Sequence, residues 1–239
     1  MDAAAWIFFI RELFFPGGCG LCGATLLEPG EAWRGLCDPC RESLEVPADD
    51  TGERCNRCGR PLVSEQGRCL SCRERDDWNC ESVSVLYPYT GTYRALAASY
   101  KFRKNLGVGN FLARRLAEYC RNHGGLEFSG FALVPVPPRP GKIRAAGWDQ
   151  VEYLARRLEH EGLPVRRCLK RLPSQTQKKL NRQDRLQNLE GRFVLTGAVP
   201  RRALIIDDIM TTGATLEACA AALKHGGAEQ VRGLCLFYG

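Results

Sequence analysis

Hydrophobic positions after residue 80 follow two periods, one typical of strands and one typical of helices. Short apolar runs bounded by glycine, proline or polar residues predict strands at 82–89, 131–137, 165–172, 203–207 and 231–238. Apolar residues that recur three and four positions apart predict helices at 107–125, 148–162 and 214–227. Strands that alternate with helices indicate an α/β fold with a doubly wound parallel sheet.

The predicted helices carry apolar faces that define part of the core. The helix at 148–162 has Val151, Leu154, Ala155 and Leu158 on one side, and the helix at 214–227 has Leu216, Cys219, Ala220 and Leu223. Asp149, followed three residues later by Glu152, predicts a capped start for the first of these helices. Between the predicted strands at 165–172 and 203–207 lies a polar segment, 173–192, which is too long for an ordinary connection and is therefore functional or disordered.

The first 80 residues follow a different pattern. The apolar start at 3–15 is interrupted by Arg11 and Glu12, so it predicts an amphipathic lead helix that packs on the body, not a signal peptide or a membrane span. The next 60 residues have few apolar side chains and many cysteines. We therefore expect two domains, 1–80 and 81–239, in a protein of the reducing cytoplasm.

Eight of the thirteen cysteines form four C-x-x-C pairs, each able to offer two thiolates to one metal ion. The pairs are Cys19/Cys22, Cys37/Cys40, Cys55/Cys58 and Cys69/Cys72. Four pairs can hold two structural Zn²⁺ ions that supply much of the folding energy of this segment. Disulfides and an iron–sulfur cluster are the alternatives. Sequential pairing, which gives two zinc ribbons, is favoured over interleaved pairing. The other five cysteines are expected to be buried thiols.

The stretch ALIIDDIMTTGATLEACAAAL, residues 203–223, carries the main chemical signal. The predicted strand ends at Asp207 and Asp208, a helix begins near Thr215, and a threonine- and glycine-bearing turn lies between them. Backbone N–H groups of such a turn and of a helix N-terminus bind phosphate. Two carboxylates beside a phosphate site make sense if they hold an uncharged diol or a metal ion. A sugar 5-phosphate satisfies both demands.

This stretch resembles the phosphoribosyl pyrophosphate (PRPP) signature of type I phosphoribosyltransferases, four apolar residues followed by D-D-x-x-T-T-G-x-T. The resemblance implies a phosphoribosyltransferase-like domain at 81–239. Asp207 and Asp208 would be catalytic and bind the ribose, and the 5-phosphate would lie on Thr211, Thr212, Gly213, Ala214 and Thr215. Magnesium would accompany PRPP, held by the ligand and by water with few protein ligands.

The order of motifs along the chain resembles the ComF (ComFC-type) competence family, which joins a zinc module to a phosphoribosyltransferase-like domain. The cysteine pairs are followed by PVPP, a basic stretch, GWDQ, a Q…L…R…N loop and the PRPP signature. The family has an R-G-F-N-Q motif where 146–150 here reads A-G-W-D-Q. Gly147 and Gln150 match, whereas Ala146 stands at the position of the arginine, for which Arg144 is the nearest substitute.

The resemblance also implies roles for two other segments. The loop after PVPP would bind pyrophosphate through Arg139, Lys142 and Arg144, because a departing pyrophosphate requires positive charge. The polar segment would be a hood that closes over the site, with Gln177, Lys178, Arg182, Arg185 and Asn188 as its ligand-facing residues. In both segments a solvated basic surface is the alternative.

The net charge of +7 is concentrated in the second half and fits phosphate-bearing partners. Three functions remain open. The first is an enzyme, a glycosyltransferase that transfers phosphoribosyl from PRPP to an acceptor that cannot be inferred. The second, implied by the family, is DNA uptake in natural transformation, with single-stranded DNA and a helicase as partners. The third is a PRPP sensor without chemistry. Fold alone does not separate them.

Overall fold

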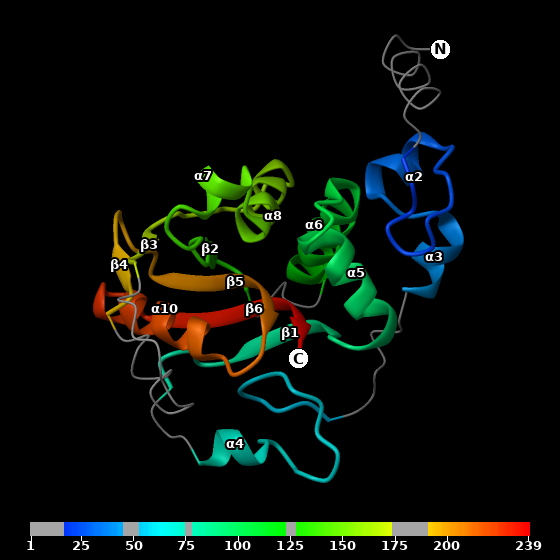
Figure 1. Ribbon diagram of the computed structural model, residues 1–239. Coiled ribbons are helices and arrows are strands. Elements are labelled where there is room, and N and C mark those ends of the chain that lie inside the picture. Colours follow the sequence, from blue (N-terminus) through cyan, green and yellow to red (C-terminus); the bar gives the residue numbers. More distant parts are fainter. Residues whose placement is uncertain (1–16, 45–52, 75–77, 123–127, 174–190) are drawn as a thin grey trace.

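The computed structural model describes residues 17–44, 53–74, 78–122, 128–173 and 191–239, and its centre is a parallel four-stranded sheet. The strands run in the order β1-β6-β5-β2 (Figure 1). They are β1 (Val83–Pro88), β6 (Gln230–Tyr238), β5 (Arg202–Met210) and β2 (Ala132–Pro135). All neighbouring pairs are parallel, so the carboxyl ends of the four strands meet at one edge of the sheet.

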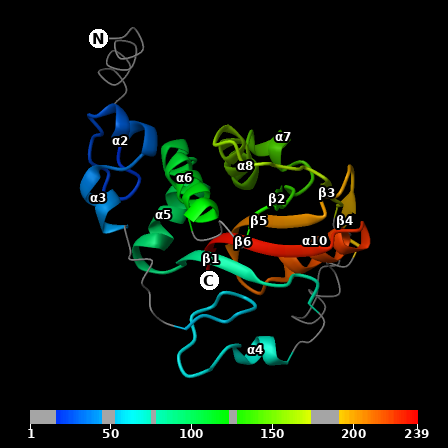
Figure 2. The same ribbon diagram turned by 180° about the vertical axis from the view of Figure 1, so that it is seen from behind.

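Helices cover both faces of this sheet, which confirms the doubly wound α/β fold (Figures 1 and 2). One face packs on α5 (Gly91–Lys101), α6 (Leu106–Asn122) and α8 (Gln150–His160). The other face packs on α10 (Ala214–His225). Successive side chains of β5 point to opposite faces of the sheet, and each face has its own hydrophobic core. Leu204 and Ile206 face the first helix layer, and Ala203 and Ile205 face the second.

A small antiparallel hairpin lies beside the sheet. It pairs β3 (Leu169–Arg171) with β4 (Phe193–Leu195). The predicted strand at 165–172 contains β3, whereas β4 was not predicted. The polar segment that joins the two strands, with the five predicted hood residues, lies at 174–190 outside the described residues.

The apolar faces predicted for α8 and α10 are buried, and the five scattered cysteines are buried as well. Asp149 caps α8, since its carboxylate accepts hydrogen bonds from the N–H groups of Val151 and Glu152. Among the described residues after 80, two helices were missed, α5 and the short α7 (Lys142–Ala146). The predicted lead helix lies outside the described residues, and the domain boundary at residue 80 stays a prediction. Among the described residues, no helix has the length and apolarity needed to cross a membrane.

The cysteine pairs form two separate small units, called here the first ribbon (17–44) and the second ribbon (53–74). The first ribbon contains α2 (Pro29–Arg34) and α3 (Asp38–Ser43), and the second contains α4 (Leu70–Arg73). The first ribbon lies beside α5 and α6, whereas the second lies next to β1 on another side of the body (Figures 1 and 2).

Candidate functional site

The acid pair lies inside β5, at the carboxyl edge of the sheet. The predicted strand ended at Asp207, but β5 continues to Met210. The prediction was wrong here because the strand remains paired with β6 as far as Tyr238, and the carboxylates are accommodated by groups from other elements. The acids therefore stand on a rigid strand and not on a loop.

Asp208 is buried and held by three donors. Its Oδ2 accepts a hydrogen bond from Gln150 Nε2 at 2.9 Å and lies 3.0 Å from Lys101 Nζ. Its Oδ1 accepts from the N–H of Ile209 at 2.9 Å. Gln150 begins α8 and Lys101 ends α5, so two helices of one layer fix the direction of this carboxylate.

Asp207 has a different environment. Its Oδ1 accepts from the N–H of Asp208 at 2.8 Å. Burial of the carboxyl and the negative charge of Asp208 raise the pKa of Asp207 well above its ordinary value, with Lys101 acting in the opposite direction. When both carboxyls are ionised, the pair carries more negative charge than its surroundings favour. A hydroxyl donor or a cation at this position relieves that repulsion.

The turn that follows β5 leads directly into the N-terminus of α10. Thr211 and Thr212 are exposed, and Gly213 is the N-cap residue with φ +73°, a left-handed conformation that favours glycine. No described side chain caps the helix in the usual way; the N–H of Ala214 makes only a long 3.4 Å hydrogen bond to Thr212 Oγ1. The first-turn N–H groups and the positive end of the helix dipole can therefore receive an anion.

The loop between β2 and α8 contributes basic residues, but in two different ways. Arg139 and Arg144 are exposed. Lys142 donates to Asp149 Oδ2 at 2.6 Å and also contacts Gln150 Oε1. Lys142 therefore forms an ion pair that links α7 to Asp149, the N-cap residue of α8. Of the three residues predicted for pyrophosphate, the structure leaves the two arginines more accessible than the lysine.

Two arginines at the β3–β4 hairpin, Arg171 and Arg192, were not predicted for the site, and they lie near the predicted Arg139. Burial lowers the pKa of Arg171, and the like charges of Arg139 and Arg192 lower it further, while Asp207 acts in the opposite direction. The guanidinium of Arg171 also lies 5.4 Å from the ring centre of Phe193, its partner across the hairpin. Among the described residues, no carboxylate forms an ion pair with these three arginines. Together they form a centre of positive charge near Asp207.

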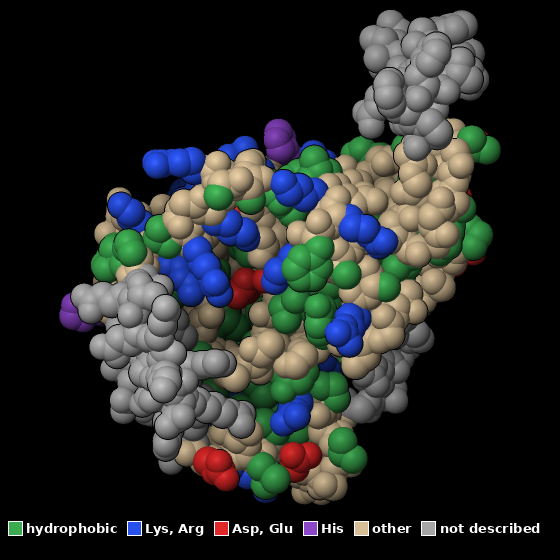
Figure 3. All heavy atoms as spheres, in the orientation of Figure 1, with side chains coloured by type: hydrophobic (Ala, Val, Ile, Leu, Met, Phe, Trp, Pro, Cys, Tyr) green, Lys and Arg blue, Asp and Glu red, His purple; other side chains and the backbone are tan. Residues whose placement is uncertain are grey.

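The surface agrees with this arrangement. Figure 3 shows a hollow in which acidic side chains lie at the bottom and lysine or arginine side chains lie on both sides. An anionic ligand entering this hollow meets positive charge at its rim and carboxylates at its floor. The combination suits a molecule with phosphate groups at its ends and hydroxyl groups between them.

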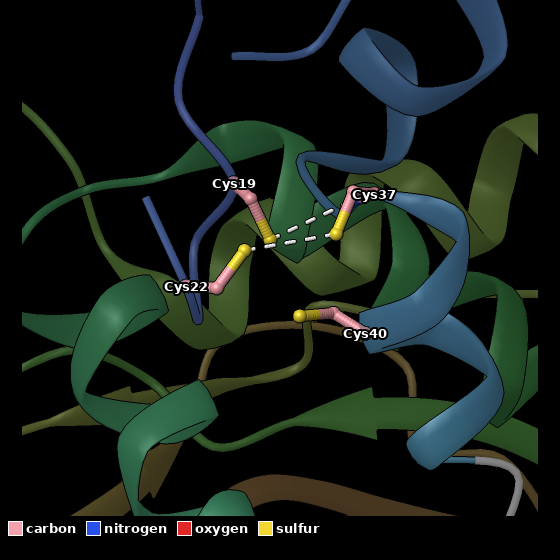
Figure 4. Close-up of side chains that lie close together, drawn as sticks. All are labelled: Cys19, Cys22, Cys37 and Cys40. Atoms are coloured by element: carbon pink, nitrogen blue, oxygen red, sulfur yellow. Dashed lines mark hydrogen bonds between the residues drawn. The ribbon is translucent and has the colours of Figure 1, made fainter. Parts of the chain in front are cut away.

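The first ribbon brings four cysteines together in the sequential pairing. The sulfurs of Cys19, Cys22, Cys37 and Cys40 lie within 4.8 Å of one another and point toward a common centre (Figure 4). The Cys22 and Cys37 sulfurs are 3.7 Å apart, close to the edge of about 3.8 Å of a tetrahedron with Zn–S bonds of about 2.3 Å. Burial raises the pKa of Cys19, but N–H donors from Cys22, Cys37 and Leu21 bring it down to about 6.

The second ribbon repeats this geometry. Its sulfurs also lie within 4.8 Å of one another, with Cys58 and Cys69 3.7 Å apart. The N–H of Cys69 donates to the sulfur of Cys55 at 3.4 Å, as the N–H of Cys37 does to Cys19 at 3.5 Å. Both four-cysteine sets fit a structural Zn²⁺ ion and leave no open coordination position, so neither is suited to metal catalysis.

Sequence reasoning missed Lys101, Arg171 and Arg192 around the acid pair, and it missed the contact of Trp78 with the turn that follows. Lys101 belongs to α5, whose apolar residues Leu96, Ala97 and Tyr100 recur at helical spacing and could have revealed the helix. The two arginines lie on a hairpin with three-residue strands, too short to give a periodic signal. Trp78 was assigned to a linker, yet it contacts the turn before α10.

Comparison with known proteins supports the whole-chain resemblance. Residues 10–73 match the model of the double zinc ribbon domain. The chain is 27% identical over 202 residues to competence protein ComFC of Streptococcus pneumoniae, covering 82% of this chain and 84% of that protein. It is 26% identical over 211 residues to competence protein F of Haemophilus influenzae, covering 84% and 89%. It is 27% identical over 232 residues to DNA utilization protein YhgH of Escherichia coli, covering 94% and 98%.

Proposed function

From the premise that this chain is a homologue of the ComF competence proteins, we propose that it binds PRPP at the carboxyl edge of the sheet and acts in the uptake or use of DNA. Each half of this proposal has its own support. The PRPP half rests on the residues of the site. The DNA half rests on the names of the relatives and on the net charge of +7.

The observation that carries the PRPP proposal is the succession of Asp207, Asp208 and the N-terminus of α10, whose N-cap residue is a glycine and so has no side chain to cap the helix. The ribose hydroxyls donate to the two carboxylates, and the 5-phosphate lies on the N–H groups of 213–215. Donation of a hydroxyl to Asp207 also reduces its repulsion with Asp208, which the raised pKa of Asp207 reports. Binding is thereby favoured by strain that is already present in the free protein.

The pyrophosphate of the ligand then meets the positive charges at the rim. Arg139, Arg171 and Arg192 lie near one another, and their mutual repulsion is relieved by a polyanion. Lys101 Nζ lies 3.0 Å from Asp208 Oδ2 and helps to orient this carboxylate. Mg²⁺, if bound with the ligand, would neutralise part of the charge on the pyrophosphate.

These positions suit a transfer reaction in which the bond between C1 of the ribose and the pyrophosphate oxygen breaks, with the electron pair leaving on pyrophosphate. The carboxylates of Asp207 and Asp208 stabilise the positive charge that develops on the ribose. An acceptor nucleophile then bonds to C1. We propose a phosphoribosyl transfer of this kind, and structural Zn²⁺ in both ribbons. A protein that binds PRPP without turnover, or that handles single-stranded DNA, is the alternative function of the same fold.

The test is a calorimetric titration of the full-length, zinc-loaded protein with PRPP and Mg²⁺. Replacing both acids, Asp207→Ala with Asp208→Ala, is expected to weaken binding about 10- to 100-fold or more, since one hydrogen bond to a charged group is worth about 1.5–3 kcal/mol. Glu229→Ala is the control, because this exposed acid pairs with Arg201 next to the amino-terminal end of β6. Equal binding by the double variant and the wild type would contradict the proposal.

Two further measurements separate the alternatives. Release of pyrophosphate in the presence of an acceptor distinguishes a transferase from a PRPP sensor. Binding of single-stranded DNA that falls steeply with salt supports the DNA-handling function, because released counterions make such binding salt-dependent. A protein that binds DNA but not PRPP would leave only the second half of the proposal standing.

A further inference from the structure

We propose that Trp78 is a positioning residue through which the second ribbon sets the geometry of the 211–215 turn, so that affinity for the phosphate of the ligand depends on the second ribbon. This inference rests on the proposed function of that turn. It concerns a part of the chain, the zinc module, whose cysteines are far from the acid pair in sequence.

The contact between Trp78 and the turn is close. A Cβ atom built on Gly213 would lie 3.1 Å from Cη2 and 3.4 Å from Cζ3 of the indole. The indole therefore packs directly against the residue that caps α10. Since Gly213 sits in a left-handed conformation with φ +73°, a surface that supports its backbone fixes the direction of the N–H groups that follow.

A second neighbour of the indole belongs to the second ribbon. The guanidinium carbon of Arg57 lies 5.8 Å from the centre of the Trp78 ring, within the range of a cation–π interaction. Arg57 lies between Cys55 and Cys58, so its backbone is fixed when these cysteines share one metal ion. Its carbonyl also accepts from the N–H of Val83 at 2.7 Å, which attaches the ribbon to β1.

The residues after Trp78 hold the first turn of α10 as well. Glu217 Oε1 accepts from both the backbone N–H and the side-chain Nδ2 of Asn79 at 2.6 Å. Glu217 Oε2 accepts from the N–H of Cys80 at 3.2 Å. These donors engage the acid of the first turn of α10, whose negative charge would otherwise repel a phosphate at the same helix end.

The first ribbon makes different contacts. Its described hydrogen bonds to the body reach α6 and the loop before it: Asn110 Nδ2 donates to the carbonyl of Trp33 and Arg103 donates to that of Gly20. Among the described residues, none of its hydrogen bonds involves the 211–215 turn. The structure therefore assigns support of the phosphate site to one ribbon and not to the other.

The experiment measures the affinity of the full-length, zinc-loaded protein for inorganic phosphate and for PRPP with Mg²⁺. Trp78→Ala is expected to weaken both by about fivefold or more, the lower range of typical coupling between sites. Trp78→Phe, which keeps an aromatic surface, is expected to restore most of the affinity. Trp33→Ala, a control in the first ribbon, is expected to bind as the wild type does. Zinc content and thermal unfolding establish that each variant is folded.

Tryptophan fluorescence gives a readout that a merely structural role would not change. Phosphate is expected to alter the emission of the wild type and of Trp33→Ala, but not that of Trp78→Phe, although this variant still binds. Should Trp78→Ala fail to fold, Arg57→Met retains the zinc ligands and the indole, and a smaller loss of affinity is expected.

The outcomes distinguish this inference from the proposed function. If the wild type binds phosphate and PRPP and Trp78→Ala binds them with the same affinity, this inference alone is overturned. Where the alanine variant does not fold, unchanged affinity in Arg57→Met has the same consequence. Absence of phosphate and PRPP binding in the wild type overturns the proposed function and this inference with it.

Discussion

The two ribbons have nearly the same local structure but different surroundings. In each, a left-handed glycine follows the second cysteine, Gly23 in the first and Gly59 in the second. In each, the third cysteine is the N-cap of a short helix. The first ribbon leaves Cys22 exposed, whereas all four cysteines of the second are buried. The same four-cysteine unit can thus expose one of its cysteines in one place and bury all four in another.

This difference follows from what each ribbon packs against. The first ribbon contacts a helix layer, where Gly35 and Gly107 allow two backbones to approach closely. The second ribbon packs on β1 and, through Arg60 above the ring of Tyr238, on the end of β6. The second ribbon therefore adjoins the edge of the sheet at which the candidate site lies. Substitutions at matched positions of the two ribbons test this difference.

The largest difference is expected from removing one zinc ligand at equivalent positions, Cys58→Ser and Cys22→Ser. Structural zinc contributes about 10–16 kcal/mol in isolated zinc-finger peptides, more than the stability of many whole domains. Both variants should lose one equivalent of zinc. Cys58→Ser is expected to lower the melting temperature much more, because Cys58 is buried whereas Cys22 is exposed. Thermal unfolding with zinc quantification checks this, and equal losses would contradict the comparison.

A smaller effect is expected from alanine at the glycines where each ribbon touches the body. Both glycines have positive φ, and a Cβ at Gly59 would lie 2.5 Å from the carbonyl oxygen of Val83, while one at Gly35 would lie 2.6 Å from the N atom of Val108. Each substitution should destabilise the protein by about 1–3 kcal/mol from backbone strain alone. Gly162→Ala, with φ +82° and no atom near its Cβ, isolates the cost of strain.

Ligand affinity separates the two glycine variants. Gly59→Ala is expected to weaken phosphate binding because it displaces the second ribbon from β1. Gly35→Ala is expected to change stability but not phosphate affinity. The reverse pattern in calorimetric titrations would show that the first ribbon supports the site.

The smallest effect concerns the acid pair, to which neither ribbon contributes a described hydrogen bond. Because the folded state raises the pKa of Asp207, its contribution to stability is present below the ordinary pKa and is lost as pH rises through the folded value. Asp207→Asn should therefore be more stable than the wild type near neutral pH, by about 1.4 kcal/mol for each unit of the raised pKa, and similar to it near pH 3–4. Denaturant unfolding across this range tests the sign, and a less stable variant at neutral pH would contradict it.

Much of the fold could be predicted from the sequence because its signals are local. The apolar faces of α8 and α10 and the C-x-x-C pairs each depend on residues a few positions apart. The position of the acid pair was predicted for the same reason. The end of β5 was not, because its last residues remain in the sheet through pairing with β6, a long-range interaction.

The surroundings of the acid pair were harder to predict. Lys101, Gln150 and Arg171 reach it from three elements separated by many residues, and their distances depend on packing. Trp78 lies in a polar stretch that reads as a linker, and only the folded chain places it against Gly213. Lys142 is the opposite case, a residue that was predicted for the site but contacts the protein. It was expected to face pyrophosphate, and instead it donates to Asp149.

The central claim is that the acid pair and the adjoining turn together hold a sugar phosphate. A crystal structure of the full-length protein with PRPP and Mg²⁺ tests it most directly. We predict the 5-phosphate within hydrogen-bonding distance of the N–H groups of 213–215 and the ribose hydroxyls on Asp207 and Asp208. A ligand bound only at the arginines, with the turn empty and both carboxylates still facing the protein, would contradict the account.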